Sequence, residues 1–570
     1  MKPATLLLGS SAASLVCAST QQNLHVRQST WTVGQTVTTS SGPVNGHASP
    51  NTTEVSEYLG IPFAQPPVGD LRFAPPQKYT GNSTINGTDF GYGCPIQSSP
   101  QSTDPAVYLE QNITIPQGIQ ILATLAQVGE KFSEDCLTVN VWTKPQTGES
   151  KKAVLLWIYG GGFNSGSSNG PAYHGQYIAN SEDVVVVSFN YRINIFGFPG
   201  NPAGANNIGL LDQRLAVEWV RDNIEAFGGD PSRITIFGQS AGGASVDYYS
   251  FAWTSDPIVA GFIPQSGTAG SFGLPHPVNE SAASWFNVTA TLNCGDAASD
   301  AQEVLSCMRT KEYTEILNAI PHSSGLGSVL GGFGPTVDEK VLFSDYPARA
   351  AAGNFIKRPV LIGNNDYEAG LFITTLGLTG TTFPASVWDT FNLDTFTCPA
   401  AVRAAYSAAA DVPTWRYRYF GEFPNLRIAP GSGAWHGAEI PLIFNNTPLI
   451  PAATEAEVSI SNYLRGAWAA FAKDPVNGLD GYEGGWPQYQ PEQETLIRLG
   501  YNNITGTNLA LPSLYDAGCA GIPVNTTNST ATSTATSSAP VATSTTSGAS
   551  RISVSTLSVV GLLLLALWMS

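Results

Sequence analysis

Unbroken apolar runs alternate with helical apolar patterns in the middle of the chain. Residues 154–159 and 184–187 are continuous apolar runs, which is typical of strands buried on both faces of a largely parallel sheet. Apolar residues then recur at helical spacing over 211–227, a Gly-Gly-Asp-Pro segment at 228–231 ends that helix, and 234–237 predicts the next strand. The alternation predicts an α/β fold with a large, mostly parallel central sheet flanked by helices.

A Gly-Gln-Ser-Ala-Gly motif at 238–242 directly follows the last of these strands. The pattern G-x-S-x-G is typical of a tight strand-to-helix turn that exposes a nucleophilic serine above a sheet. The same pattern occurs at 166–170, but there it lies in a loop rich in Gly, Ser and Asn with no strand immediately before it. Ser240 is therefore the candidate nucleophile, and Ser168 is a chance match.

Attack by a serine creates an oxyanion, which backbone N–H groups must stabilise. One donor is expected from the residue after the nucleophile, Ala241. The other donors are expected from a glycine-rich loop after an earlier strand, and Gly161 and Gly162 follow the strand at 154–159. The alternative for this loop is an ordinary flexible glycine turn.

The base of such a site is a histidine, and in this kind of fold the chain order is serine, acid, histidine. After Ser240 the sequence contains only His276, His322 and His436. The first two lie beside prolines with no strand before them, whereas His436 lies late in the chain in a loop pattern. His436 is therefore the candidate base.

The acid must lie between Ser240 and His436. Residues 360–362 predict a strand, and the polar segment that follows contains Asp366 and Glu368. Physical reasoning from the residues does not separate these two acids.

Composition restricts the class of partner. Of the 570 residues 12% are charged, and the formal net charge is −17. A protein this acidic repels phosphate backbones, so nucleic acid is excluded as a partner. No metal-ligand or phosphate-binding motif is present, and neither a metal nor another cofactor is expected.

The N-terminus predicts secretion. Lys2 precedes a short apolar stretch at 6–16 and small residues at 17–19, the pattern of a signal peptide covering residues 1–18, with cleavage after Ala18 or Ser19. The catalytic domain is expected over 29–522. Asn-x-Ser/Thr sequons agree with secretion and lie at Asn51, Asn82, Asn86, Asn112, Asn279, Asn287, Asn445 and Asn503, with two more at Asn525 and Asn528.

Secretion makes disulfides possible. Six cysteines remain after the signal peptide, namely Cys94, Cys136, Cys294, Cys307, Cys398 and Cys519. Six cysteines allow about fifteen pairings, so counting alone does not choose among them.

The composition changes sharply after the catalytic domain. Residues 523–547 are dominated by Thr, Ser, Ala and Asn, which predicts an O-glycosylated stalk. Residues 548–570 contain small residues, a polar spacer and an apolar tail shorter than a membrane span. This pattern predicts removal of the tail and a GPI anchor attached near Ser547 or Gly548 on the outer membrane surface.

Many ordered blocks resemble the type-B carboxylesterase/lipase family, which includes cholinesterases and fungal lipases. The resemblance covers nearly the whole globular region and rests on blocks at 58–64, 66–69, 134–137, 160–163, 190–192, 209–213, 227–231 and 238–243. It implies an α/β-hydrolase fold, the triad Ser240, Glu368 and His436, and an oxyanion hole at the predicted glycine loop. It favours Glu368 over Asp366, because the family's acid is usually a glutamate in a similar block.

The resemblance also implies disulfide pairing and a lid. The implied pairs are Cys94–Cys136, Cys294–Cys307 and Cys398–Cys519. In related lipases the loop closed by the first pair, here residues 95–135, is a lid over the site.

Two departures from the family change the expected substrate. Gln239 replaces a glutamate found in many relatives, and no Trp lies between Cys94 and Cys136. Both changes remove attraction for a quaternary ammonium. Phe163 either favours an apolar acyl or alcohol group or is a core residue.

The sequence thus predicts a secreted hydrolase of neutral carboxylic esters that acts through an acyl-serine intermediate on a small-molecule or lipid ester. One alternative is an interfacial triacylglycerol lipase. An alternative of another class is a catalytically silent cell-surface adhesion protein.

Overall fold

A computed structural model describes residues 31–97, 105–144, 151–322 and 332–521. The expected signal peptide, stalk and anchor tail, with the sequons at Asn525 and Asn528, lie outside these residues.

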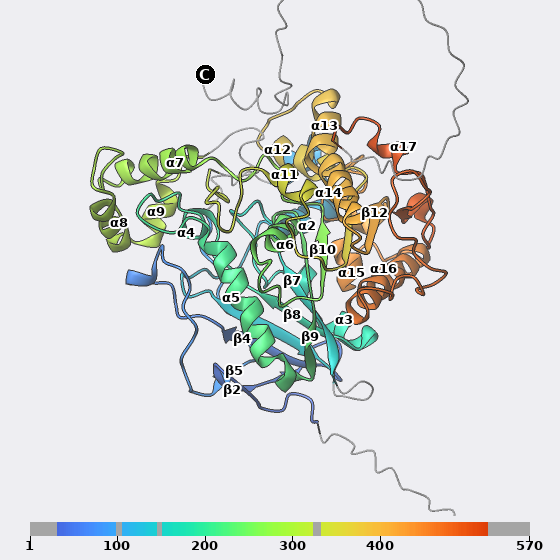
Figure 1. Cartoon of the computed structure of the whole chain (residues 1–570), viewed down its shortest axis with the longest axis horizontal. Coiled ribbons are helices and arrows are strands. Elements are labelled where there is room, and N and C mark those ends of the chain that lie inside the picture. The colour runs from blue at the N-terminus through green and yellow to red at the C-terminus, as the bar shows by residue number, and fades with distance from the viewer. Residues whose placement is uncertain (1–30, 98–104, 145–150, 323–331, 522–570) are drawn as a thin grey trace, which may run out of the picture.

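A large twisted sheet forms the centre of the molecule (Figure 1). Within the described residues it has ten strands, in the order β13-β12-β11-β10-β9-β7-β8-β6-β4-β3. The seven strands from β13 to β8 run parallel, whereas β6, β4 and β3 each run antiparallel to the preceding strand. The prediction of a mostly parallel central sheet is therefore confirmed. Its strands are β3 (His47–Ala48), β4 (Ser56–Pro62), β6 (Thr138–Thr143), β7 (Lys152–Ile158), β8 (Val185–Phe189), β9 (Gly229–Gln239), β10 (Gly261–Gln265), β11 (Val360–Asn365), β12 (Thr414–Tyr419) and β13 (Leu496–Leu499).

The predicted strands are present, with one difference in length. The apolar runs at 154–159 and 184–187 form β7 and β8, whose side chains are all buried. The strand predicted over 234–237 already begins at Gly229, because this residue pairs with Lys152 of β7 across an irregularity in the ladder. The glycine and proline that suggested a turn are thus part of β9.

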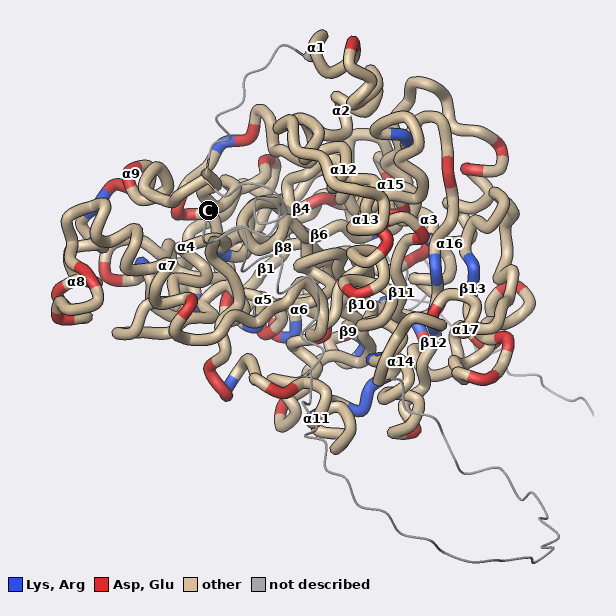
Figure 2. The backbone as a smooth tube through the Cα atoms, turned by 90° about the horizontal axis from the view of Figure 1, so that it is seen from above, with Lys and Arg blue, Asp and Glu red and all other residues tan. Residues whose placement is uncertain are grey.

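Helices cover both faces of the sheet. Figure 2 shows α5 (Ile208–Asn223), α6 (Ala241–Ala252) and α14 (Cys398–Ala409) on one side, and α3 (Gln176–Glu182), α15 (Ile440–Phe444) and α16 (Glu455–Lys473) on the other. The predicted helix over 211–227 is α5 continued by a 3-10 turn, Ile224–Phe227, which ends at Gly228 with a positive φ of 86°. Buried apolar side chains from both layers pack on the sheet and form the main core.

Smaller elements surround this core. A three-stranded sheet comprises β1 (Val37–Thr39), β2 (Gly42–Asn45) and β5 (Ile85–Asn86). The remaining helices are α1 (Pro105–Glu110), α2 (Pro116–Leu125), α4 (Asn194–Gly197), α7 (Val278–Thr291), α8 (Ala301–Thr310), α9 (Tyr313–Asn318), α11 (Tyr346–Ala351), α12 (Ala369–Gly377), α13 (Ala385–Asn392) and α17 (Ser513–Asp516).

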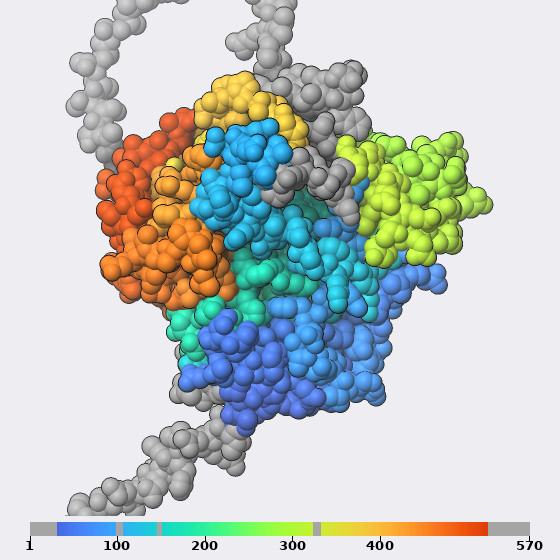
Figure 3. Space-filling view, turned by 180° about the vertical axis from the view of Figure 1, so that it is seen from behind, coloured from blue at the N-terminus to red at the C-terminus, as the bar shows by residue number. Residues whose placement is uncertain are grey.

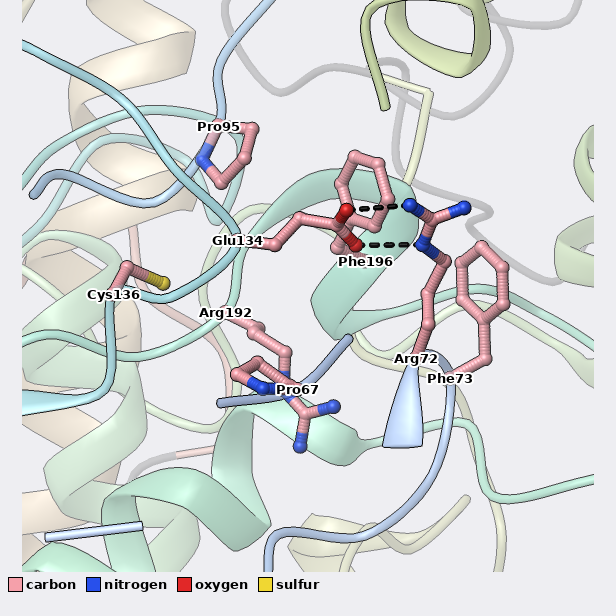
Figure 4. A pocket seen from close by; sticks show the side chains of 8 residues that line it. All are labelled: Pro67, Arg72, Phe73, Pro95, Glu134, Cys136, Arg192 and Phe196. Carbon is pink, nitrogen blue, oxygen red and sulfur yellow. Dashed lines mark hydrogen bonds and ion pairs between the residues drawn. The ribbon is translucent and has the colours of Figure 1, made fainter. Parts of the chain in front are cut away.

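Disulfides link the predicted pairs. The described chain contains Cys94–Cys136, Cys294–Cys307 and Cys398–Cys519. Near the end of the first disulfide loop, the buried Glu134 accepts hydrogen bonds from Arg72, with 2.6 Å between Nε and Oε1 (Figure 4). Arg72 also donates to the carbonyls of Met308 and Lys311. This buried ion pair therefore fixes the base of the loop that carries α1 and α2.

Within the described ranges, no helix combines the length and apolarity needed to cross a membrane. In the same ranges, no group of three or more His, Cys, Asp or Glu side chains is arranged to hold a metal ion.

Candidate active site

The turn between β9 and α6 carries Ser240. Its backbone is strained, with φ of 61° and ψ of −124°, and its N–H donates to the carbonyl of Gln265 at 2.9 Å. A Cβ on Gly242 would lie 2.0 Å from the oxygen of Ile158, and one on Gly238 would lie 2.6 Å from the oxygen of Gly242. Glycine is required at both positions because the turn packs directly on neighbouring backbone.

His436 lies in the turn before α15 and contacts a buried acid. Its Nδ1 is 2.6 Å from Oε2 of Glu368, which follows β11. The other carboxylate oxygen of Glu368 accepts hydrogen bonds from Ser266 Oγ at 2.7 Å and from the N–H of Asn365 at 2.6 Å. Glu368 is completely buried, so these bonds hold the carboxylate in one orientation.

The structure separates the two acids that the sequence left open. Asp366 instead pairs with Arg418 on β12, with 2.8 Å between its Oδ1 and Nε of Arg418. Its side chain is 39% exposed. Glu368, and not Asp366, therefore contacts His436.

Aromatic rings surround the histidine. The rings of Phe372 and Phe396 lie with their centroids 5.1 and 5.0 Å from that of His436. Nε2 of His436 is buried and has no hydrogen-bond partner among the described residues. Ser240 and His436 line the same cavity, but no hydrogen bond joins them in this arrangement. The bond between nucleophile and base is often long before substrate binds.

The glycine loop lies against the nucleophile. A Cβ on Gly160 would be 2.8 Å from Cβ of Ser240. Gly161 and Gly162 have positive φ values of 111° and 60°, and Ala241 is the first residue of α6. Within the described chain the N–H groups of Gly161, Gly162 and Ala241 have no hydrogen-bond acceptor, so they are available to a ligand oxygen.

A cavity of about 600 Å³ contains these groups. Its walls come from the glycine loop, from α2 in the first disulfide loop, from α12 and from the segment around α15. No Lys, Arg, Asp or Glu is among the described residues that line it, and Gln239 is. In Figure 3 the light-blue segment that includes α1 and α2 lies on the surface between the orange and the yellow-green parts of the chain, and residues of α2 line the cavity.

Phe163 is a core residue. Its side chain is fully buried and packs edge-on against Phe198, with 5.2 Å between ring centroids. Phe163 also lines the cavity, so it is both a core residue and part of the apolar wall beside the glycine loop.

The other sequence candidates lie elsewhere. Ser168 is buried and accepts a hydrogen bond from Asn140 at 3.1 Å. His276 pairs with Thr336, and burial lowers its pKa below the usual 6.5. His322 is exposed. All eight of the sequons within the described residues have exposed asparagines.

Sequence reasoning missed three polar residues around the Glu368–His436 pair. Ser266 follows β10 and Asn365 ends β11, so polar residues at strand ends were the available signal. Glu439 lies three residues after His436 and is buried. An acid in the same turn as the candidate base could have marked it.

The mostly parallel sheet flanked by helices is an α/β-hydrolase fold, and one cavity at this sheet contains Ser240 and His436. The sequence model of the Carboxylesterase family matches residues 33–383 and 379–513, and the chain belongs to this family. It is a carboxylic ester hydrolase, so the catalytically silent alternative is set aside.

Curated relatives agree with this assignment. The chain is 37% identical over 456 residues to a chlorogenic acid esterase of Aspergillus niger, covering 78% of this chain and 84% of the relative. It is 34% identical to Secreted lipase 5 of Gibberella zeae, covering 83% and 91%. It is also 32% identical to a cholinesterase of Mus musculus, covering 81% and 83%.

Proposed function

We propose that the protein hydrolyses neutral carboxylic esters through an acyl intermediate on Ser240. The observation that carries this proposal is the buried His436–Glu368 pair, 2.6 Å apart, in the cavity that Ser240 also lines. His436 accepts the proton of Ser240 Oγ as the oxygen attacks the ester carbonyl, and then gives that proton to the departing alcohol. Water then attacks the acyl carbonyl in the same way. His436 accepts the proton of the water and returns it to Ser240 Oγ, so that the carboxylic acid and the free serine are released.

The remaining groups stabilise charge. Glu368 orients the imidazole and stabilises the imidazolium that forms in each step. The N–H groups of Gly161, Gly162 and Ala241 bind the oxyanion. The strained turn and the glycines that pack on it keep Ser240 in place while bonds change.

The substrate proposal rests on the charge of the cavity. Its described lining contains no ionisable carboxylate or cation, and Gln239 adds only a neutral amide. A quaternary ammonium group therefore lacks an anionic neighbour, and the first disulfide loop offers it no indole ring, a contact worth roughly 0.5–2 kcal/mol. Neutral acyl and alcohol groups fit this apolar lining.

A matched pair of esters tests this proposal. With equal acyl groups, kcat/KM for a neutral ester is expected to exceed that for the choline ester by about tenfold or more, since about 1.4 kcal/mol of transition-state binding suffices. The variant Gln239→Glu is expected to narrow this ratio by restoring a negative charge. Equal turnover of both esters by the unaltered protein would contradict the substrate assignment.

A second candidate is hydrolysis at a lipid surface. Leu449 borders the cavity and is 87% exposed, and the next residue, Ile450, is 80% exposed. Exposed apolar groups at the mouth of a site suit contact with an oil or membrane surface, and one relative is named a lipase. A sharp rise in rate as an ester passes its solubility limit, lost in Leu449→Ser, would favour this candidate over a soluble esterase.

We also propose that the chain is secreted, with the catalytic domain over 29–522 followed by the stalk at 523–547 and a GPI anchor. The leader pattern and the tail pattern support this proposal. The exposed positions of the eight described sequons and the three disulfides are consistent with it.

A further inference from the structure

A second buried acid, Glu439, lies beside the Glu368–His436 pair. It is 1% exposed and stands at the start of α15. Its Oε2 accepts a hydrogen bond from Nδ2 of Asn365 at 2.6 Å, and its Oε1 accepts one from Nε2 of Gln265 at 3.2 Å. Among the described residues no Lys or Arg pairs with it. A buried carboxyl group that lacks a cation is costly and calls for an explanation.

Asn365 connects this acid to the proposed triad. Its N–H donates to Oε1 of Glu368 at 2.6 Å. Its Nδ2 donates to Glu439 and, at 2.7 Å, to the carbonyl of Trp435, which precedes His436. Asn365 thus binds the triad acid through its backbone N–H, and the backbone of the histidine turn and Glu439 through its side chain.

The charges around Glu439 are few and all belong to this network. Burial and the charge of Glu368 raise the pKa of Glu439 from 4.5 to about 7, while the hydrogen bond from Asn365 and the charge of His436 oppose this rise. The other titratable groups that face it are the hydroxyls of three tyrosines whose own pKa values are raised by burial first and by Glu439 second or later, namely Tyr173, Tyr417 and Tyr419.

The surroundings have unused hydrogen-bonding capacity. Oδ1 of Asn365 and the hydroxyls of Tyr417 and Tyr419 are buried and have no partner within the described residues. Both carboxyl oxygens of Glu439 already accept amide hydrogens, from Gln265 and Asn365. The ionised form of Glu439 therefore has a hydrogen-bond donor for each of its carboxylate oxygens.

We propose that Glu439 is a positioning residue that holds the Glu368–His436 pair through Asn365 and, when ionised, stabilises the imidazolium form of His436. In the transition state His436 gains a positive charge, and a second carboxylate in the same low-dielectric region lowers the energy of that charge. Protonation of Glu439 removes this stabilisation. This inference rests on the proposed triad. It states that ionisation of Glu439 helps to set the lower end of the pH range in which the triad is fastest.

The full-length variant Glu439→Gln tests this role, because it keeps the size of the side chain and removes its charge. On a neutral ester, the acid limb of kcat/KM is expected to contain two ionisations in the unaltered protein and one in the variant. The midpoint of the limb moves to lower pH in the variant. The plateau kcat of the variant is expected to fall by about three- to tenfold, because the imidazolium of His436 loses a carboxylate that stabilises it, with KM within about twofold.

Glu457→Gln is the matched control. Glu457 is also a buried glutamate that accepts from an asparagine, Asn425, but it caps α16. This variant is expected to keep the two-ionisation profile even where its melting temperature falls. A folded Glu439→Gln protein with an unchanged acid limb would overturn the proposal.

The unaltered protein gives an independent reading if Glu439→Gln fails to fold. Infrared difference spectra with labelled glutamate are expected to contain a buried carboxylic-acid band that disappears between pH 6 and pH 8, and its absence contradicts the inference. Failure of the triad itself is distinguishable, since Ser240→Ala would then retain turnover. An inactive Ser240→Ala protein with no such band refutes the role of Glu439 alone.

Discussion

Close backbone approach, more than side-chain chemistry, fixes the residues around the proposed nucleophile. Gly238 and Gly242 are needed because a Cβ at either position would meet a backbone oxygen at 2.6 Å or less. The N–H of Ser240 is held by the neighbouring strand β10. The serine can keep an unfavourable backbone conformation because the sheet on both sides determines it.

The two neighbouring acids give a matched pair of variants. Glu368→Gln is expected to lower kcat by roughly 10²- to 10⁴-fold, because an amide holds the wrong tautomer of His436 and does not balance the imidazolium charge. Asp366→Asn is expected to change kcat by less than about threefold, since its partner is the partly exposed Arg418. Steady-state kinetics on one neutral ester compare them. A larger effect at Asp366 would contradict the assignment of the acid.

The residues differ in how far sequence could predict them. Ser240 and His436 follow from a local motif and from chain order. Glu368 and Asp366 are two residues apart, and what separates them is Arg418, 52 positions away on a neighbouring strand. Glu439 gives no local signal of its role, because its contacts with Gln265 and Asn365 exist only after β10 and β11 have formed the sheet.

At the scale of elements, one buried carboxylate joins the antiparallel edge of the sheet to the segment before α3. Glu57 on β4 lies 2.9 Å from Nε2 of His47 on β3 and 2.9 Å from Nε2 of His174, and accepts from Trp142 on β6 at 2.6 Å. Residues 171–173, immediately before His174, line the cavity. This carboxylate therefore connects the sheet edge to a wall of the site.

The same contacts predict how stability depends on pH. Burial alone would raise the pKa of Glu57, but the hydrogen bond and charge of His174, with smaller contributions from Trp142 and His47, hold it below the usual 4.5. The native state thus binds fewer protons, so this stabilisation is present above about pH 4.5 and is lost as pH falls through the folded pKa.

Glu57→Gln is expected to lower the free energy of unfolding at pH 7 by about 1–3 kcal/mol, since buried donors lose a charged acceptor. The difference in the free energy of unfolding between this variant and the unaltered protein is expected to narrow as pH falls from 5 to 3. Thermal melts over this range measure it. Glu54→Gln is the control, because Glu54 is 74% exposed in its pair with Lys144 and such pairs contribute little. A gap that widens in acid would refute the role of Glu57.

At the scale of the whole molecule, acidic residues outnumber basic ones, 43 to 26, and the excess is visible over the whole backbone in Figure 2. The apolar, uncharged cavity contrasts with this surface. A net negative charge disfavours binding to anionic surfaces, so the proposed lipid anchor and the apolar residues at the cavity mouth are the features expected to mediate contact with a membrane.

The proposed anchor predicts a separable C-terminal part. The full chain is expected on the outer membrane surface and to be released by a phosphatidylinositol-specific phospholipase. A chain ending at Asn525 is expected in the medium, with kcat/KM within about twofold, because all the described residues that line the cavity precede Gly521. Mass spectrometry of the C-terminus checks the processing. Residues 557–570 still present on a phospholipase-resistant protein would contradict the anchor.

The central claim is that Ser240 forms the acyl intermediate, and one measurement tests it most directly. Purified protein is treated with a serine-directed organophosphate, and the modified peptide is identified while turnover of a neutral ester is followed. The account predicts a single adduct on Ser240 in step with loss of activity, and a Ser240→Ala protein that folds, takes up no label and has kcat lower by roughly 10⁴-fold or more. Turnover near that of the unaltered protein in Ser240→Ala, or an adduct on another serine that accounts for the inactivation, would contradict it.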